Sequence, residues 1–118
     1  MPRSLPHRFD PGQPFEAKYH YWVARPFQLD PTITPLFPTP NHPSYPSAHG
    51  CDDAAAAAVL AYLFPREAAF FEERAREAAE SRLWAGIHFR SDLEAGLKLG
   101  AAVGQLVVER ARQDDRVR

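Results

Sequence analysis

The amino-acid sequence predicts an all-α protein, a helical bundle that carries one long proline-rich loop. Eleven of the 12 prolines lie at or before Pro46 and the last is Pro65, so helix-breaking residues are concentrated in the first part of the chain. From Ala48 onward the sequence is helical in character, and no alternation of apolar and polar residues indicates a strand. The 118 residues suffice for one domain with a single core.

The first part of the chain contains one short predicted helix and one long predicted loop. Residues 15–24 (FEAKYHYWVA) lack proline and favour a short helix, whereas residues 26–47 form the loop. Loops longer than about 15 residues in compact domains are usually functional or disordered. The segment FPTPNHPSYPS is too rich in aromatic residues and prolines for a simple flexible linker. We therefore expect residues 26–47 to form an active-site loop.

Three further helices are predicted in the second part of the chain, over residues 51–64, 65–84 and 90–111. Pro65 is favourable at the first position of a helix and so separates the first two. A turn around Gly86 precedes the third helix. We expect the polar residues 112–118 to form a frayed tail.

Small residues recur at positions that would let these helices approach closely. Five consecutive alanines occupy residues 54–58, and Gly96, Gly100 and Gly104 recur at every fourth position of the last predicted helix. Residues four apart lie on one helix face, so the three glycines form one smooth surface. Both patterns are typical of close helix packing.

The composition limits the classes of partner. The 14 basic residues nearly balance the 15 acidic ones, so no overall field favours a nucleic acid, and any anion site must be built locally. No secretory signal and no membrane-spanning segment is apparent, so we expect a soluble protein. The sequence does not indicate its cellular compartment. The single cysteine, Cys51, excludes an internal disulfide and is expected to be a buried packing residue.

Two segments in the first half carry polar residues that packing does not require. In KYHYWVARP, Lys18 and Arg25 are seven residues apart, two helical turns, so both could project from one face. In HPSYPSAHG, Ser47 and His49 directly precede a helix, whose free backbone N–H groups form a ready anion site. The alternatives are two surface cations and a simple cap of the helix by Ser47.

The third polar segment is SRLWAGIHFRSD, with Arg82, His88 and Asp92. If a helix begins near His88, the Asp92 carboxylate reaches back one turn to the imidazole and fixes its tautomer. The other ring nitrogen is then a better nucleophile or ligand, unless the two residues form only a surface pair. Taken together, the three segments offer dense cationic donors for a tetrahedral oxyanion.

The three segments resemble the signature of the type 2 phosphatidic acid phosphatase and vanadium haloperoxidase superfamily. That signature is K-x6-R-P, then P-S-G-H, then S-R-x5-H-x3-D, and the internal spacings here agree with it between Lys18 and Asp92. Ala48 replaces the usual glycine, a change that matters only if the backbone there needs a positive φ. The resemblance implies an all-α fold of which this chain, as one domain over residues 1–118, is an incomplete, C-terminal portion.

The resemblance also implies a role for each matching residue. His88 would bond covalently to phosphorus or vanadium, His49 would act as acid and base, and Asp92 would orient His88. His42 occupies the position that lines the halide site in bromide-oxidising members, with a loop histidine of no function as the alternative. The oxyanion, phosphate or vanadate, would be held by residues matching Lys18, Arg25, Ser47, Arg82 and the backbone N–H of Ala48.

Three functions follow from this resemblance. The first is a vanadium-dependent haloperoxidase, with vanadate as cofactor and with hydrogen peroxide and a halide as substrates. The second is a soluble acid phosphatase that hydrolyses phosphomonoesters through a phosphohistidine on His88 and needs no cofactor. The third is a truncated, inactive homologue. The few residues before Lys18 favour a fold completed by another segment or by a second copy of the chain.

Overall fold

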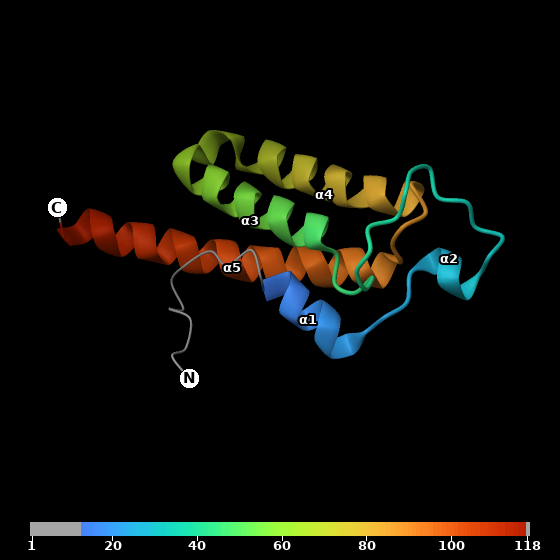
Figure 1. Ribbon diagram of the computed structural model, residues 1–118. Helices are drawn as coiled ribbons and strands as arrows, with labels where there is room; N and C mark the ends of the chain where they lie inside the picture. Colours follow the sequence, from blue (N-terminus) through green and yellow to red (C-terminus); the bar gives the residue numbers. More distant parts are fainter. Residues whose placement is uncertain (1–12, 118) are drawn as a thin grey trace.

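The computed structural model describes residues 13–117, and these residues form an all-α fold without a strand (Figure 1). Two short helices precede three long ones, and a 3₁₀ turn, Pro65–Glu67, joins the first two long helices. The α-helices are α1 (Gln13–Tyr21), α2 (Pro26–Leu29), α3 (Ala48–Leu63), α4 (Ala68–Trp84) and α5 (Arg90–Val117). The molecule is flat, with extents of 57 × 40 × 19 Å.

Helix α3 is the centre of the bundle, with α5 on one side and α4 on the other (Figure 1). The contact between α3 and α5 is the most extensive, and glycines make it possible. A Cβ atom added to Gly100 would lie 2.8 Å from the carbonyl carbon of Cys51, and one added to Gly104 would lie 2.5 Å from the Ala58 Cβ. The glycine spacing therefore predicted this contact correctly.

The core is built mainly from small side chains. Three of the five consecutive alanines, Ala54, Ala55 and Ala57, are buried, as are Ala75 and Ala79 of α4. Larger apolar side chains, among them Ile87 and Leu93, close the core near the start of α5. Because few large side chains separate the helices, their backbones approach each other closely and hold one another rigidly.

The loop between α2 and α3 returns across the end of the bundle and meets the turn between α4 and α5. The Leu36 backbone N–H donates to the Ala85 carbonyl, and the Ser47 N–H donates to the Asp92 carbonyl, both at 3.0 Å. Gly86 lies in that turn with a φ of 81°, a conformation that favours glycine. The end of α1, the loop, and the starts of α3 and α5 thus gather in one region (Figure 1).

Several boundaries differ from the sequence-based expectations. Helix α2 lies within residues 26–47, which were expected to form a loop, and α3 begins at Ala48 instead of residue 51. The first helix ends at Tyr21 instead of continuing to residue 24, because Trp22 adopts a left-handed φ of 52° and Pro26 disfavours helix before it. The C-terminal residues expected to fray continue α5 to Val117. Contacts with α3 accompany this extension, since the Tyr62 hydroxyl donates to Asp115 at 3.0 Å.

No helix between residues 13 and 117 is both long enough and apolar enough to cross a membrane.

Candidate active site

Lys18 and Arg25 converge on one point, but not by the route that the sequence suggested. Lys18 lies in α1, whereas Arg25 lies beyond the helix in extended conformation, with φ −72° and ψ 156°. The expectation of two side chains on one helix face is therefore wrong. The chain turns back after α1, and both cations reach the same loop: Lys18 Nζ donates to the Pro43 carbonyl at 2.7 Å, and Arg25 Nε donates to the His42 carbonyl at 3.0 Å.

The Arg25 guanidinium links this loop to His88. Its Nη1 donates to the Ile87 carbonyl at 2.8 Å and lies 3.1 Å from His88 Nε2, while its Nη2 lies 3.1 Å from His42 Nδ1. A guanidinium can only donate, so His88 Nε2 is an acceptor in this arrangement and carries no proton. Arg25 is 2% exposed, so these contacts are made out of water.

Asp92 holds the opposite side of the His88 ring. The protonated Nδ1 of His88 donates to Asp92 Oδ2 at 3.1 Å, and the Phe89 backbone N–H donates to the same oxygen at 2.8 Å. Burial lowers the pKa of His88, although the hydrogen bond to Asp92 opposes this effect, so the imidazole is neutral at neutral pH. Nε2 is thus unprotonated, and in this structure its lone pair accepts the hydrogen bond from Arg25. The contact between His88 and Asp92 is the one that their four-residue spacing predicted.

Ser44 is a third partner of this pair, and the sequence-based interpretation did not include it. Its hydroxyl donates to Asp92 Oδ2 and lies 3.5 Å from His88 Nδ1, and its backbone N–H donates to the Val23 carbonyl at 2.8 Å. Ser44 is fully buried. The prolines on both sides of Ser44, Pro43 and Pro46, indicate a rigid loop, but only the fold shows which group the Ser44 hydroxyl contacts.

The charges at this site do not balance. Lys18 is 0% exposed and Arg25 is 2% exposed, and the buried anion beside them is the Asp92 carboxylate. Burial, with a contribution from Arg25, lowers the pKa of the Lys18 ammonium to about 8, even though Asp92 opposes the shift. Two buried cations facing one carboxylate favour a further anion at this site.

Arg82 adds an unsatisfied donor near the two cations. Its guanidinium stacks on the Phe37 ring at 5.1 Å from the centroid, and its Nε is buried without a hydrogen-bond partner among residues 13–117. The positive charge of Arg82 also contributes to the lowered pKa of Arg25, after the larger effect of burial. An orphaned buried donor beside buried cations is what an oxyanion would satisfy.

The start of α3 carries the PSAH segment. Ser47 is buried and caps the helix, its Oγ accepting from the Gly50 N–H at 3.1 Å, which is the simpler of the two alternatives considered for it. Ala48 is the first residue of the helix. Among residues 13–117, Trp22 is the only residue other than glycine with a positive φ. The replacement of glycine by Ala48 is therefore unstrained. His49 is exposed in the first turn, and among residues 13–117 the hydrogen-bond partners of His88 are Arg25, Ser44 and Asp92 rather than His49.

His42 lies beside Arg25 at the edge of this site. His42 packs edge-on against Phe15, with ring centroids 5.0 Å apart. Burial, and to a smaller extent the Lys18 charge, lowers the pKa of the His42 imidazole.

Cys51 is 2% exposed, and burial raises the pKa of its thiol to about 11. The thiol is therefore protonated and unreactive, which confirms the interpretation of Cys51 as a packing residue.

Binding of a tetrahedral anion is expected to weaken as the pH rises through about 8, because Lys18 then loses its proton. The anion binds preferentially to the protein with a charged Lys18 ammonium. Above that pKa, Lys18 must therefore take up a proton when the anion binds, and the affinity falls by up to about tenfold per pH unit. Isothermal titration calorimetry with sulfate measures this effect, since the charge of sulfate is constant in this range.

Lys18→Met provides the matched control for this measurement. This variant should bind sulfate more weakly at low pH and should lose the decline above pH 8. A wild-type affinity that stays constant between about pH 7 and pH 9 would show that Lys18 does not face the anion.

Two comparisons place the chain among known proteins. The family model described as "PAP2 superfamily" matches residues 13–115. The crystal structure described as the first bacterial vanadium-dependent iodoperoxidase is similar to this structure, with a TM-score of 0.73 and 30% sequence identity. The match covers 81% of this chain and 29% of the iodoperoxidase chain. This chain therefore spans less than a third of the length of that protein.

Proposed function

Because this chain belongs to the PAP2 superfamily, we propose that it is a vanadium-dependent haloperoxidase that oxidises a halide with hydrogen peroxide at vanadate held by His88. The observation that carries the proposal is the neutral His88 imidazole, fixed between Asp92 on Nδ1 and the Arg25 guanidinium on Nε2. Superfamily members are enzymes of two kinds, phosphatases and haloperoxidases. The similarity to the iodoperoxidase and the position of His42 beside Arg25 favour the second kind.

The donor set suits vanadate, which is a tetrahedral oxyanion. Lys18 supplies a compact charge, Arg25 and Arg82 supply planar forks, and the orphaned Arg82 Nε requires an acceptor. The excess of buried cations over the Asp92 carboxylate would be neutralised by the anion. We therefore assign Lys18, Arg25 and Arg82 as oxyanion-binding residues, with Ser47 and the Ala48 N–H at the start of α3.

Each remaining residue has a defined task in this proposal. Vanadate, when bound, supplies the chemistry that activates peroxide toward a halide. His88 would hold it through Nε2 in place of the present contact with Arg25, and Asp92 with Ser44 keeps the Nδ1 proton on the far side of the ring. His49, exposed at the start of α3, is assigned the role of acid and base. His42, packed on Phe15, lines the halide path.

A vanadium measurement combined with two activity assays tests the proposal. The purified full chain, prepared without phosphate and then dialysed from orthovanadate, should retain vanadium and should oxidise bromide or iodide with peroxide, measured by halogenation of a dye. Hydrolysis of p-nitrophenyl phosphate that vanadate inhibits, without halide oxidation, would instead assign the acid phosphatase activity. Inactivity in both assays, with no oxyanion-dependent rise in melting temperature, would identify a non-catalytic homologue.

A further inference from the structure

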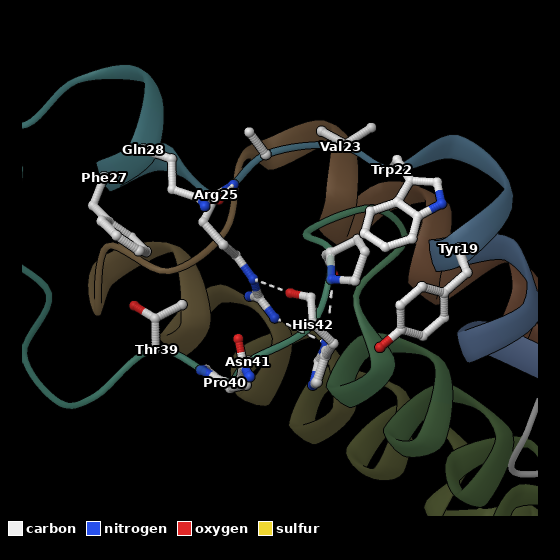
Figure 2. A pocket seen from close by; sticks show the side chains of 12 residues that line it. Tyr19, Trp22, Val23, Arg25, Phe27, Gln28, Thr39, Pro40, Asn41 and His42 are labelled. Carbon is white, nitrogen blue, oxygen red and sulfur yellow. Dashed lines mark hydrogen bonds between the residues drawn. The ribbon is translucent and has the colours of Figure 1, made fainter.

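Two consecutive loop carbonyls, those of His42 and Pro43, hold the two buried cations of the candidate active site. The His42 carbonyl accepts from Arg25 Nε at 3.0 Å, and the Pro43 carbonyl accepts from Lys18 Nζ at 2.7 Å. In Figure 2 the Arg25 side chain reaches from the segment after α1 to His42 of the loop. Because both acceptors are backbone groups, the positions of the cations depend on where this part of the loop lies.

The next residue, Ser44, ties this part of the loop to two other segments. Its backbone N–H donates to the Val23 carbonyl at 2.8 Å, two residues before Arg25 in the chain. Its hydroxyl donates to Asp92 Oδ2 at the start of α5. Ser44 is therefore bonded both to the segment that carries Arg25 and to the residue that orients His88.

Burial strengthens the contact between Ser44 and Asp92. Ser44 is 0% exposed and Asp92 is 1% exposed, so water does not compete for the carboxylate. A hydrogen bond to a charged group stabilises more than one between neutral groups. The other carboxylate oxygen, Asp92 Oδ1, is buried without a partner among residues 13–117. The donors that orient this carboxylate, Ser44 among them, thus all act through Oδ2.

The covalent geometry of the loop carries a displacement of Ser44 to both carbonyls. The ring of Pro43, directly before Ser44, restricts φ to about −65°, and the peptide units are planar. Few torsions therefore remain between Ser44 and the carbonyls of His42 and Pro43 to absorb a movement. Without the bond from Ser44 to Asp92, the loop would be held less firmly against α5, and the two cations would move with it.

We propose that Ser44 is a positioning residue of the oxyanion site, which sets where the two buried cations lie relative to the His88–Asp92 pair. It acts through Asp92 and through the loop carbonyls, and it is assigned no contact with the oxyanion itself. The inference rests on the oxyanion site of the proposed function. It applies equally to vanadate and to phosphate, because both anions require the same cations.

Sulfate binding to the purified full chain, measured by isothermal titration calorimetry, tests this role without any turnover. Ser44→Ala removes the hydroxyl but none of the donors assigned to the oxyanion. It should weaken sulfate binding roughly fivefold, the effect of one lost hydrogen bond. Ser91→Ala is the matched control, because Ser91 directly precedes Asp92 and is exposed. This control should bind sulfate as tightly as the wild-type protein does.

The pH profile separates positioning from a general loss of stability. In the wild-type protein the affinity for sulfate should decline above about pH 8, where Lys18 loses its proton. If Ser44 positions Lys18, this decline should be shallower in Ser44→Ala, whereas a merely less stable protein would lose affinity equally at every pH. Ser44→Cys, which keeps nearly the same volume but donates weakly, should behave in the same way and replaces Ser44→Ala if that variant does not fold.

A thermal unfolding curve verifies that each variant is folded at the temperature of the titration. Wild-type affinity in a folded Ser44 variant, or a weakened affinity with an unchanged pH profile, would overturn the inference and leave the proposed function intact. A wild-type chain that binds no sulfate at any pH would remove the oxyanion site itself, and this inference with it.

Discussion

Replacing His88 with alanine is expected to abolish vanadate retention and to lower halide oxidation by at least about 10³-fold. Nε2 of His88 is the one atom assigned to bond the central atom of the oxyanion, and neither Lys18 nor Arg25 can replace it, because both only donate hydrogen bonds. The start of α5 should persist in this variant, since Asp92 keeps its hydrogen bonds from Ser44 and Phe89.

The measurement is bound vanadium after dialysis, together with the oxidation rate and a far-UV circular dichroism spectrum that verifies the fold. His20→Ala is the matched control, because His20 is an exposed histidine of α1 that packs on the Tyr21 ring and has no assigned role at the site. It should behave like the wild-type protein in all three measurements. If His88→Ala retained vanadium and near-normal rates, the assignment of the nucleophile would be wrong.

Replacing Gly100 with alanine is expected to destabilise the protein by at least about 2 kcal/mol. The new methyl group would lie 2.8 Å from the Cys51 carbonyl carbon and 2.9 Å from the Ala54 Cβ, closer than real contacts allow. The obstacle is helix backbone, which cannot rotate away as a flexible side chain can. The gain of about 1 kcal/mol from the helix propensity of alanine does not offset the separation of α3 from α5.

Thermal and urea unfolding measure this effect, with an expected decrease in melting temperature of about 10 °C for a domain of this size. Gly50→Ala is the matched control, because its added Cβ would meet its nearest neighbours at 3.4 Å. That variant should change the free energy of unfolding by less than about 1 kcal/mol. A Gly100→Ala protein as stable as Gly50→Ala would contradict the close α3–α5 packing.

The parts of the site that the sequence predicted best are those set by local helix geometry. Asp92 follows His88 by four residues, a spacing that brings two side chains together at the start of any helix. Likewise, glycines at every fourth position lie on one face regardless of what packs against it, so Gly96, Gly100 and Gly104 indicated the α5 contact in advance. A spacing of four residues places side chains on one helix face whatever the rest of the fold is, so it can be recognised from the sequence.

The parts that could not be predicted depend on the path of the loop from α2 to α3. Lys18 and Arg25 meet because the chain reverses at Trp22, and the loop then brings the Pro43 and His42 carbonyls to them. Ser44 reaches Asp92, 48 residues away, by the same path. Prolines make such a loop stiff, but they do not specify its direction.

By itself, therefore, the sequence determined which residue types are available for oxyanion chemistry, and it determined the helices that carry them. The tertiary structure decided which of these side chains are buried together: Arg25 against His88 Nε2, Ser44 on Asp92, and His49 in solvent. The physical reason is that helix formation depends on neighbours within four residues, whereas burial and hydrogen bonding between segments depend on how the whole chain excludes water.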